Sequence, residues 1–447
     1  MIFAARRAGI AYRDSWLWLP HTVLNPWAAK ASLTFDIAGT NSQILLYQEA
    51  DNHLIVPREY VALSPKFEAN APLIDLIPEF EERDFTDLMT PRDPGQAFAW
   101  QAYAAADNGV LNLGCGKGKT ALSCKKIAQR RAPAIVIVNQ ASLMNQWAEQ
   151  IHQFLGIPLS DIGKVQGPKF DWEGKSVVLA MIQTLASRAD KWPMNFRQYF
   201  GTVIFDECHH LSAPMFSRTA PLFWGARYGL SATPNRADAL ERVYYLHLGD
   251  AFYTDMSQEL TPRIYFQQLP TEVDMAGPDV RDKFGEFNIS RFWAHLAQNV
   301  DRNQRIAQHV IQAEQEGRKV LVLGHSKVGL SHLWASIPQA GVVTGDVSNP
   351  AERLDTFRNS QVVLATMDVA AEALDAPALD TVFFTTPFKN WRLLIQGMGR
   401  ALRRHEGKKA PVIVIFEDRR VKPSKGLCRK LKTALTQNGF QYFEVPL

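Results

Sequence analysis

The chain has 447 residues, of which 46% are hydrophobic and 21% are charged, and its formal net charge is +4 at pH 7. This length predicts two or three domains, and the composition excludes a disordered chain, whereas the small charge permits a nucleic-acid partner without indicating one. No apolar run approaches the roughly 18 residues of a membrane span. The cysteines show no CxxC spacing, so we expect a reduced cytoplasmic protein without a disulfide framework.

The first 85 residues predict a small β-rich module. Short strands are expected at Ser32–Ile37, Gln43–Gln48 and His53–Pro57, with turn residues between them. Three tryptophans and several cations lie nearby: Trp16, Trp18, Trp27, Arg6, Arg7, Arg13 and Lys30. Aromatic and basic residues interleaved in this way can stack on and hold nucleic acid. The alternative, which we favour, is that these aromatic side chains pack inward as the core of the module.

The segment Leu111–Leu122, LNLGCGKGKTAL, predicts a phosphate-binding loop. An apolar strand, Gly109–Leu113, leads through three glycines into Lys119-Thr120 and the start of a helix. Glycines let backbone N–H groups converge on an anion, and the helix amino terminus adds a partial positive charge. Lys119 would reach the phosphates and the Thr120 hydroxyl would bind Mg²⁺. The alternative is a basic surface turn, since Leu113 replaces the first glycine of the general pattern.

Strands and helices then alternate, which predicts a parallel sheet with crossover helices. The expected elements are a helix at Ala97–Ala106 and strands at Ala134–Val138, Ser176–Met181 and Thr202–Phe205. The last strand runs into Asp206-Glu207-Cys208-His209-His210, at the edge where such sheets place their chemistry. We expect Asp206 to hold Mg²⁺ and Glu207 to deprotonate the attacking water. Zinc binding by the cysteine and histidines is less favoured, because adjacent residues diverge and no further ligand pair lies nearby.

The second half predicts another α/β block. A partly stranded segment, Thr261–Ala276, is expected to connect the two halves, and a helix follows at Asn299–Gln315. Four strands are then expected, the last of which would close the sheet: Lys319–Gly324, Gln361–Thr366, Val382–Thr385 and Val412–Phe416.

The motifs GCGKGKT, DECHH and GLSATPNR, in this order and spacing, resemble the motor core of superfamily 2 helicases and translocases. PRDPGQ resembles the adenine-recognising segment of that family, and NQASLMNQW and MIQTL resemble its strand-gripping motifs. The resemblance covers about Arg92 to Asp418, with Ala373 and Gly397 as departures from the usual residues. The motif style is nearest to the branch-migration helicases of tailed phages and the XPB-like group.

The resemblance implies ATP and Mg²⁺ as cofactors and assigns roles to individual positions. Residues implied in catalysis are Lys119, Asp206, Glu207, Arg400 and Arg403, and those implied in holding magnesium are Thr120 and Asp206. Residues implied in ATP binding are Arg92, Gln96, Gly114, Cys115, Gly116, Lys117, Gly118, Lys119, Thr120, Ala121 and Asp375. Residues implied in gripping nucleic acid are Asn139, Gln140, Gln146, Gln183, Thr184, Ser326 and Thr366. Without the other motifs, Arg400 and Arg403 would be interpreted as part of a solvated helix face.

We therefore expect an α/β protein with two tandem RecA-like domains and a small amino-terminal module. The expected bounds are 1–85 for the module, 86–255 for the first motor domain, 256–295 for a connecting segment and 296–447 for the second. The expected function is an ATP-dependent helicase or translocase that unwinds or remodels forked and branched DNA, in a bacterial or phage-infected cell. Replication or recombination proteins are possible partners. The alternatives are the motor subunit of a restriction or nuclease complex and an ATP-dependent RNA helicase or clamp.

Overall fold

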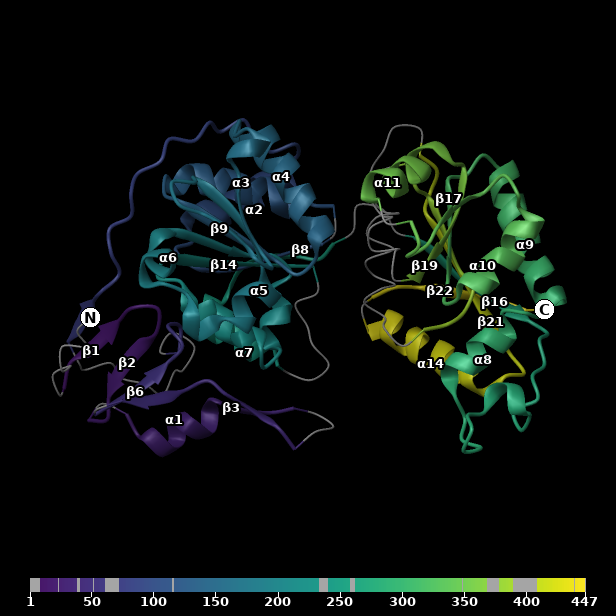
Figure 1. Cartoon of the computed structure of the whole chain (residues 1–447), viewed down its shortest axis with the longest axis horizontal. Helices are drawn as coiled ribbons and strands as arrows, with labels where there is room; N and C mark the ends of the chain where they lie inside the picture. Colours follow the sequence, from purple (N-terminus) through teal and green to yellow (C-terminus); the bar gives the residue numbers. More distant parts are fainter. Residues whose placement is uncertain are drawn as a thin grey trace. The chain divides into compact units, whose positions relative to one another are not determined.

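The computed structural model describes residues 9–446 except 23, 38–40, 51, 61–71, 115, 233–239, 258–261, 348, 368–377, 389–407 and 438. The chain divides into two compact units, Met1–Met256 and Ser257–Leu447, each built on a largely parallel sheet (Figure 1). The predicted α/β fold class is confirmed. No helix in these described ranges is both long enough and apolar enough to cross a membrane.

An eight-stranded sheet in the order β11-β10-β12-β9-β13-β14-β8-β15 forms the centre of unit 1. Only β11 is antiparallel to its neighbour. The strands are β8 (Gly109–Leu113), β9 (Ala134–Val138), β10 (Gly163–Gln166), β11 (Lys169–Asp171), β12 (Val177–Met181), β13 (Thr202–Phe205), β14 (Ala226–Ser231) and β15 (Ala251–Asp255). The central strands are buried on both faces, which explains why they read as continuous apolar runs.

Helices cover both faces of this sheet (Figure 1). One face packs against α2 (Pro94–Ala105), α3 (Lys119–Arg130) and α4 (Ala141–Leu155). The other packs against α5 (Ile182–Ser187), α6 (Met194–Tyr199) and α7 (Glu241–Leu248). The carboxyl ends of β8, β9, β12 and β13 therefore lie along one edge, where the predicted site residues follow them.

The amino-terminal region is β-rich, as predicted, but its elements differ in detail. A five-stranded sheet has the order β5-β6-β2-β1-β7, and β3 pairs with β4 separately. The strands are β1 (Ala11–Arg13), β2 (Leu17–Pro20), β3 (Thr34–Asp36), β4 (Gln43–Leu45), β5 (Gln48–Ala50), β6 (His53–Val56) and β7 (Leu73–Asp75). The strand expected from Ser32 begins at Thr34, because α1 (Pro26–Ser32) precedes it with Asn25 as its cap. The strand expected at Gln43–Gln48 is divided between β4 and β5.

This region shares a hydrophobic core with α7. Leu17, Leu54 and Val56 pack in one buried cluster with Val243 and Leu246. The backbone N–H of Glu59 donates to the Leu246 carbonyl over 3.1 Å. Arg227, in β14, is fully buried and donates to the carbonyl of Ser15. The amino-terminal strands are thus an integral part of unit 1.

Unit 2 contains a seven-stranded parallel sheet in the order β18-β19-β17-β20-β21-β16-β22. Its strands are β16 (Arg263–Leu269), β17 (Val320–Gly324), β18 (Gly341–Val343), β19 (Val362–Thr366), β20 (Thr381–Phe384), β21 (Val412–Asp418) and β22 (Tyr442–Val445). The expectation that β21 closes the sheet is wrong, because β16 and β22 lie beyond it. The segment expected to connect the two halves therefore supplies a strand of this sheet.

Helices again cover both faces in unit 2. The helices are α8 (Ile289–Leu296), α9 (Val300–Gln315), α10 (Lys327–Ser336), α11 (Pro350–Asn359) and α14 (Lys422–Gln437). Side chains of α9 and α10 share one buried cluster with the sheet, and side chains of α11 and α14 share the other. The amino-terminal ends of α9 and α10 meet at the carboxyl edge of the strands.

Candidate active site and strand-contact residues

The predicted phosphate loop joins β8 to α3 in unit 1. Gly116 and Gly118 have φ angles of 82° and 83°, which side chains of L-residues rarely adopt. A Cβ atom on Gly118 would lie 2.1 Å from Nε2 of Gln96. Glycine at this position therefore permits both the turn and the close approach of Gln96. Cys115 lies outside the described residues.

Arg92 and Gln96, predicted to bind the nucleotide, are bonded to this loop. Nη2 of Arg92 donates to the carbonyl of Gly116 over 2.9 Å, and Nε2 of Gln96 donates to that of Lys117 over 3.3 Å. The Gln96 side chain also accepts from the Arg92 backbone N–H. Asp93 caps α2 by accepting from the Gln96 N–H over 2.8 Å. The segment before α2 and the phosphate loop thus form one hydrogen-bonded unit.

Lys119, Thr120 and Ala121 form the first turn of α3, directly after Gly118. Nζ of Lys119 donates to the Leu113 carbonyl over 2.9 Å, its one hydrogen bond within the described part of the chain. The neighbouring Lys117 instead pairs with Asp255. A lysine ammonium and a helix amino terminus without a carboxylate partner fit an anionic ligand such as a nucleotide phosphate.

The carboxylate pair Asp206-Glu207 directly follows β13. Nε1 of Trp147 donates to Oδ2 of Asp206 over 2.8 Å, and the Glu207 N–H donates to Oδ1 over 3.0 Å. Burial, followed by the charge of Glu207, raises the pKa of Asp206 to about 6. Burial acts in the same direction on Glu207, but contact with His209 and the charge of Lys119 outweigh it and lower its pKa. The Lys119 charge favours the ionised form of both carboxyls.

Glu207 has a left-handed backbone with φ 48°. This conformation costs about 1–2 kcal/mol for a residue other than glycine, and such outliers cluster at functional sites. Nδ1 of His209 lies 3.3 Å from Oε2 of Glu207. The backbone thus holds the Glu207 carboxylate in a fixed place beside His209.

A chain of contacts leads from this carboxylate toward the predicted strand-contact residues of unit 1. The rings of His209 and His210 lie 4.4 Å apart, and Nε2 of His210 lies 2.7 Å from Nδ2 of Asn139. Nε2 of Gln183 donates to the Asn139 carbonyl over 2.9 Å. The ends of β9, β12 and β13 are therefore bonded to one another.

The other three predicted strand-contact residues of unit 1 lie on α4 and α5. Gln140 is the amino-terminal cap position of α4 and makes no side-chain capping bond, and Gln146 is half-buried within that helix. The Thr184 hydroxyl, in α5, accepts from the Gly167 N–H over 3.0 Å. Gln140 directly precedes α4, and Gln146 and Thr184 lie within helices that follow β9 and β12.

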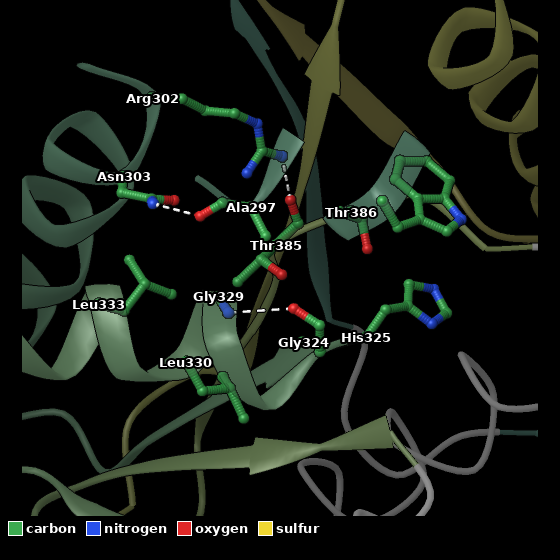
Figure 2. A pocket seen from close by; sticks show the side chains of 12 residues that line it. Ala297, Arg302, Asn303, Gly324, His325, Gly329, Leu330, Leu333, Thr385 and Thr386 are labelled. Atoms are coloured by element: carbon green, nitrogen blue, oxygen red, sulfur yellow. Dashed lines mark hydrogen bonds between the residues drawn. The ribbon is translucent and has the colours of Figure 1, made fainter. Parts of the chain in front are cut away.

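In unit 2 the predicted strand-contact residues lie at the ends of neighbouring strands: Ser326 shortly follows β17, and Thr366 is the last residue of β19. Gly324 of β17 is in register with Thr366 of β19, and Thr366 is buried. The Ser326 hydroxyl caps α10 by accepting from the Gly329 N–H over 3.0 Å. Figure 2 labels Gly329, the donor of this bond. Asp375, Arg400 and Arg403 lie outside the described residues, so their predicted roles remain proposals.

Sequence reasoning did not assign three residues that the structure places at the site. Trp147 belongs to a segment that resembles a strand-gripping motif, yet its indole N–H bonds to Asp206. The sequence suggests His209 only as a zinc ligand and gives no role to Asp255. Their contacts join positions 59, 2 and 138 residues apart, and two of these separations carry no local signal. Only the proximity of His209 to Glu207 was visible in the sequence.

Comparison with known families decides the assignment. The family described as "Type III restriction enzyme, res subunit" matches residues 87–236, and "Helicase conserved C-terminal domain" matches residues 301–405. Together these matches cover more than half of the chain. The chain belongs to superfamily 2 of the helicases and translocases. Its two largely parallel sheets are those of the tandem RecA-like domains that the sequence predicted.

Individual relatives agree with this assignment. The chain is 25% identical to the DNA 3'-5' translocase XPB2 of Sulfurisphaera tokodaii, over 68% of this chain and 66% of that protein. It is also 25% identical to the "Probable helicase D10" of Escherichia phage T5, over 69% of this chain and 67% of that protein. The fold is similar to that of S. cerevisiae Dbp5 bound to RNA and ADP BeF3, with a TM-score of 0.53, 15% identity and coverage of 78% and 89% of the two chains. The chain thus spans about two thirds of the curated relatives' length.

Proposed function

We propose that the chain is an ATP-driven motor that moves along DNA and unwinds or remodels forked and branched structures. The observation that supports this most is the assembly of Lys119, Asp206 and Glu207 at one edge of the unit 1 sheet, beside a loop bonded to Arg92 and Gln96. Proteins of this superfamily use ATP, and one relative is named a DNA translocase.

In this proposal each residue of the site has a defined task. Lys119 and the loop amides bind the phosphates, and Arg92 and Gln96 hold the base side of the nucleotide. Thr120 and Asp206 would hold Mg²⁺, which supplies charge stabilisation to the phosphates. Glu207 orients the attacking water and accepts its proton. Asp375 would contact the ribose, and Arg400 and Arg403 would stabilise negative charge on the transferring phosphoryl group.

The amino-terminal region, with its strands and α1, is the proposed source of a preference for branched DNA. Contacts to the phosphate backbone of a single strand cannot by themselves distinguish a fork from a plain strand. Trp18 is buried and bonds to Asp14, and Trp16 packs against His247, which confirms the core interpretation for these two residues. Trp27 differs, because it is 84% exposed and Lys30 Nζ lies 5.8 Å from its ring centre. Trp27 is therefore the residue to which this proposal assigns base stacking, while Lys30 beside it pairs with Glu49 over 2.7 Å.

The experiment compares the Trp27→Ala protein with the unaltered chain on single-stranded and forked DNA. Stacking of a base on an aromatic ring contributes about 1–3 kcal/mol, so affinity for forks should fall by roughly fivefold or more. The concentration of single-stranded DNA that gives half-maximal ATP turnover should not change. Removing the whole region would expose the core shared with α7 and leave Arg227 buried without Ser15, so a point substitution is the cleaner test.

The matched control is Phe443→Ala, which removes a 51% exposed aromatic side chain from β22, outside the proposed sites. It should leave fork affinity unchanged. Equal fork affinity in Trp27→Ala and Phe443→Ala would refute the proposed recognition surface. If RNA but not DNA stimulated ATP turnover of the unaltered chain, an RNA helicase or clamp would be favoured instead.

A further inference from the structure

The indole of Trp147 connects α4 to the carboxylate pair at the end of β13. Its Nε1 lies 2.8 Å from Oδ2 of Asp206, although the two residues are 59 positions apart in the sequence. The proposed function makes Asp206 a ligand of Mg²⁺ and gives Trp147 no task. The proposed metal ligand is therefore held by a side chain from another element of the fold.

The Trp147 side chain is fixed by the core of unit 1. It is 1% exposed and packs in one hydrophobic cluster with Val136 of β9 and Ile204 of β13. Because protein interiors are close-packed, the indole ring cannot turn without displacing these neighbours. A buried indole N–H needs an acceptor, which here is Oδ2 of Asp206. The donor is thus a fixed point, and the carboxylate is aligned against it.

The Asp206 carboxylate is held at both of its oxygens. Oδ1 accepts from the Glu207 N–H over 3.0 Å, and Oδ2 accepts from the Trp147 indole. The backbone of Asp206 is fixed as well, since its N–H donates to the Ile137 carbonyl over 2.9 Å. Each carboxylate oxygen has two lone pairs, so each keeps one that can bind a cation. This arrangement fits a metal ligand whose orientation is set before the metal binds.

We propose that Trp147 is a positioning residue, which holds the Asp206 carboxylate in the orientation that binds Mg²⁺. The inference rests on the proposed function, in which Asp206 holds the metal. Groups that hydrogen-bond to a metal ligand orient that ligand, and their removal typically lowers metal affinity by about 10–100-fold. Trp147 acts through Asp206 and has no contact of its own with the nucleotide in this proposal.

The test uses the full chain with Trp147→Phe, because phenylalanine fills most of the space of the indole and lacks its N–H. Binding of a fluorescent ATP analogue is measured in EDTA and across a Mg²⁺ titration, and ATP turnover at saturating DNA across the same titration. The Mg²⁺ concentration at half-saturation should rise by about tenfold or more in both measurements. Binding in EDTA should stay unchanged, and saturating Mg²⁺ should restore turnover.

The matched control is Trp192→Phe, which removes the same part of a buried tryptophan elsewhere in unit 1. Nε1 of Trp192 donates to the Leu185 carbonyl over 2.9 Å, and its ring packs in the cluster on the other face of the sheet. The loss of packing and of one indole hydrogen bond is therefore comparable. This protein should keep the Mg²⁺ dependence of the unaltered chain.

An unchanged Mg²⁺ concentration at half-saturation in a folded Trp147→Phe protein would overturn the inference. Nucleotide binding that weakens equally in EDTA and in Mg²⁺ would mean that the indole only packs, and would also overturn it. If the Trp147→Phe protein does not fold, benzothienylalanine at position 147 gives the same test, because it keeps the shape of the indole with sulfur in place of N–H. If Mg²⁺ has no effect on nucleotide binding by the unaltered chain, the proposed role of Asp206 fails, and the inference fails with it.

Discussion

Replacing Glu207 with glutamine should abolish ATP turnover while leaving ATP binding intact. Glutamine keeps the shape of the side chain but cannot accept a proton from water. General-base catalysis contributes about 10²–10⁴-fold, so turnover should fall by that factor. The proposed phosphate contacts come from Lys119 and the loop before α3, which this change does not touch. Binding of a fluorescent ATP analogue and steady-state phosphate release measure the two effects separately.

The matched control is Glu149→Gln, an exposed glutamate on α4 that changes the net charge equally. It should hydrolyse ATP at the rate of the unaltered chain. Near-native turnover in the Glu207→Gln protein would show that another group activates the water. Loss of ATP binding would show that the carboxylate belongs to the nucleotide-binding contacts.

Replacing His210 with alanine should uncouple DNA binding from hydrolysis. His210 is the link between Asn139, a proposed strand contact, and His209, which lies against Glu207. A hydrogen bond contributes about 0.5–1.5 kcal/mol, so turnover at saturating DNA should fall by roughly threefold to tenfold. Turnover without DNA and the DNA concentration at half-saturation should both remain unchanged, because neither catalytic group nor strand contact is removed.

His152→Ala is the control for this change, since His152 makes one local hydrogen bond to the Ile157 carbonyl on the surface of α4. DNA should stimulate ATP turnover of the His152→Ala protein as strongly as that of the unaltered chain. A parallel fall in turnover with and without DNA would mean that His210 only supports the fold around Glu207. A raised half-saturating DNA concentration would mean that His210 contacts the strand directly.

Local patterns predicted those parts of the fold whose signal lies within a few residues. The strands expected at Ala134–Val138 and Thr202–Phe205 coincide with β9 and β13, because both are apolar runs bounded by polar residues. The phosphate loop was recognisable from its glycines, two of which have the left-handed backbone that only this residue adopts readily. The carboxylate pair Asp206-Glu207 was likewise recognisable from the local sequence, because it directly follows the apolar run of β13.

Features that depend on distant pairing were not predictable. The strand β16 pairs with β21 about 150 residues later, so its own sequence reads as a connecting segment. The bond from Trp147 to Asp206 joins α4 to the end of β13, and no spacing rule indicates it. Burial of Trp18 but exposure of Trp27 likewise follows from how β2 and α1 pack, not from composition.

The most direct test of the proposed motor is the rate of ATP hydrolysis by the unaltered chain without nucleic acid and with single-stranded, duplex, forked and four-way DNA. We expect a low rate without nucleic acid, a strong rise with single-stranded DNA and the highest rates with forked or four-way DNA. The Lys119→Ala protein, which lacks the proposed phosphate contact and is expected to be inactive, serves as the background. If the rate of ATP hydrolysis without nucleic acid equalled the rate with each of these DNAs, the proposed motor function would be contradicted.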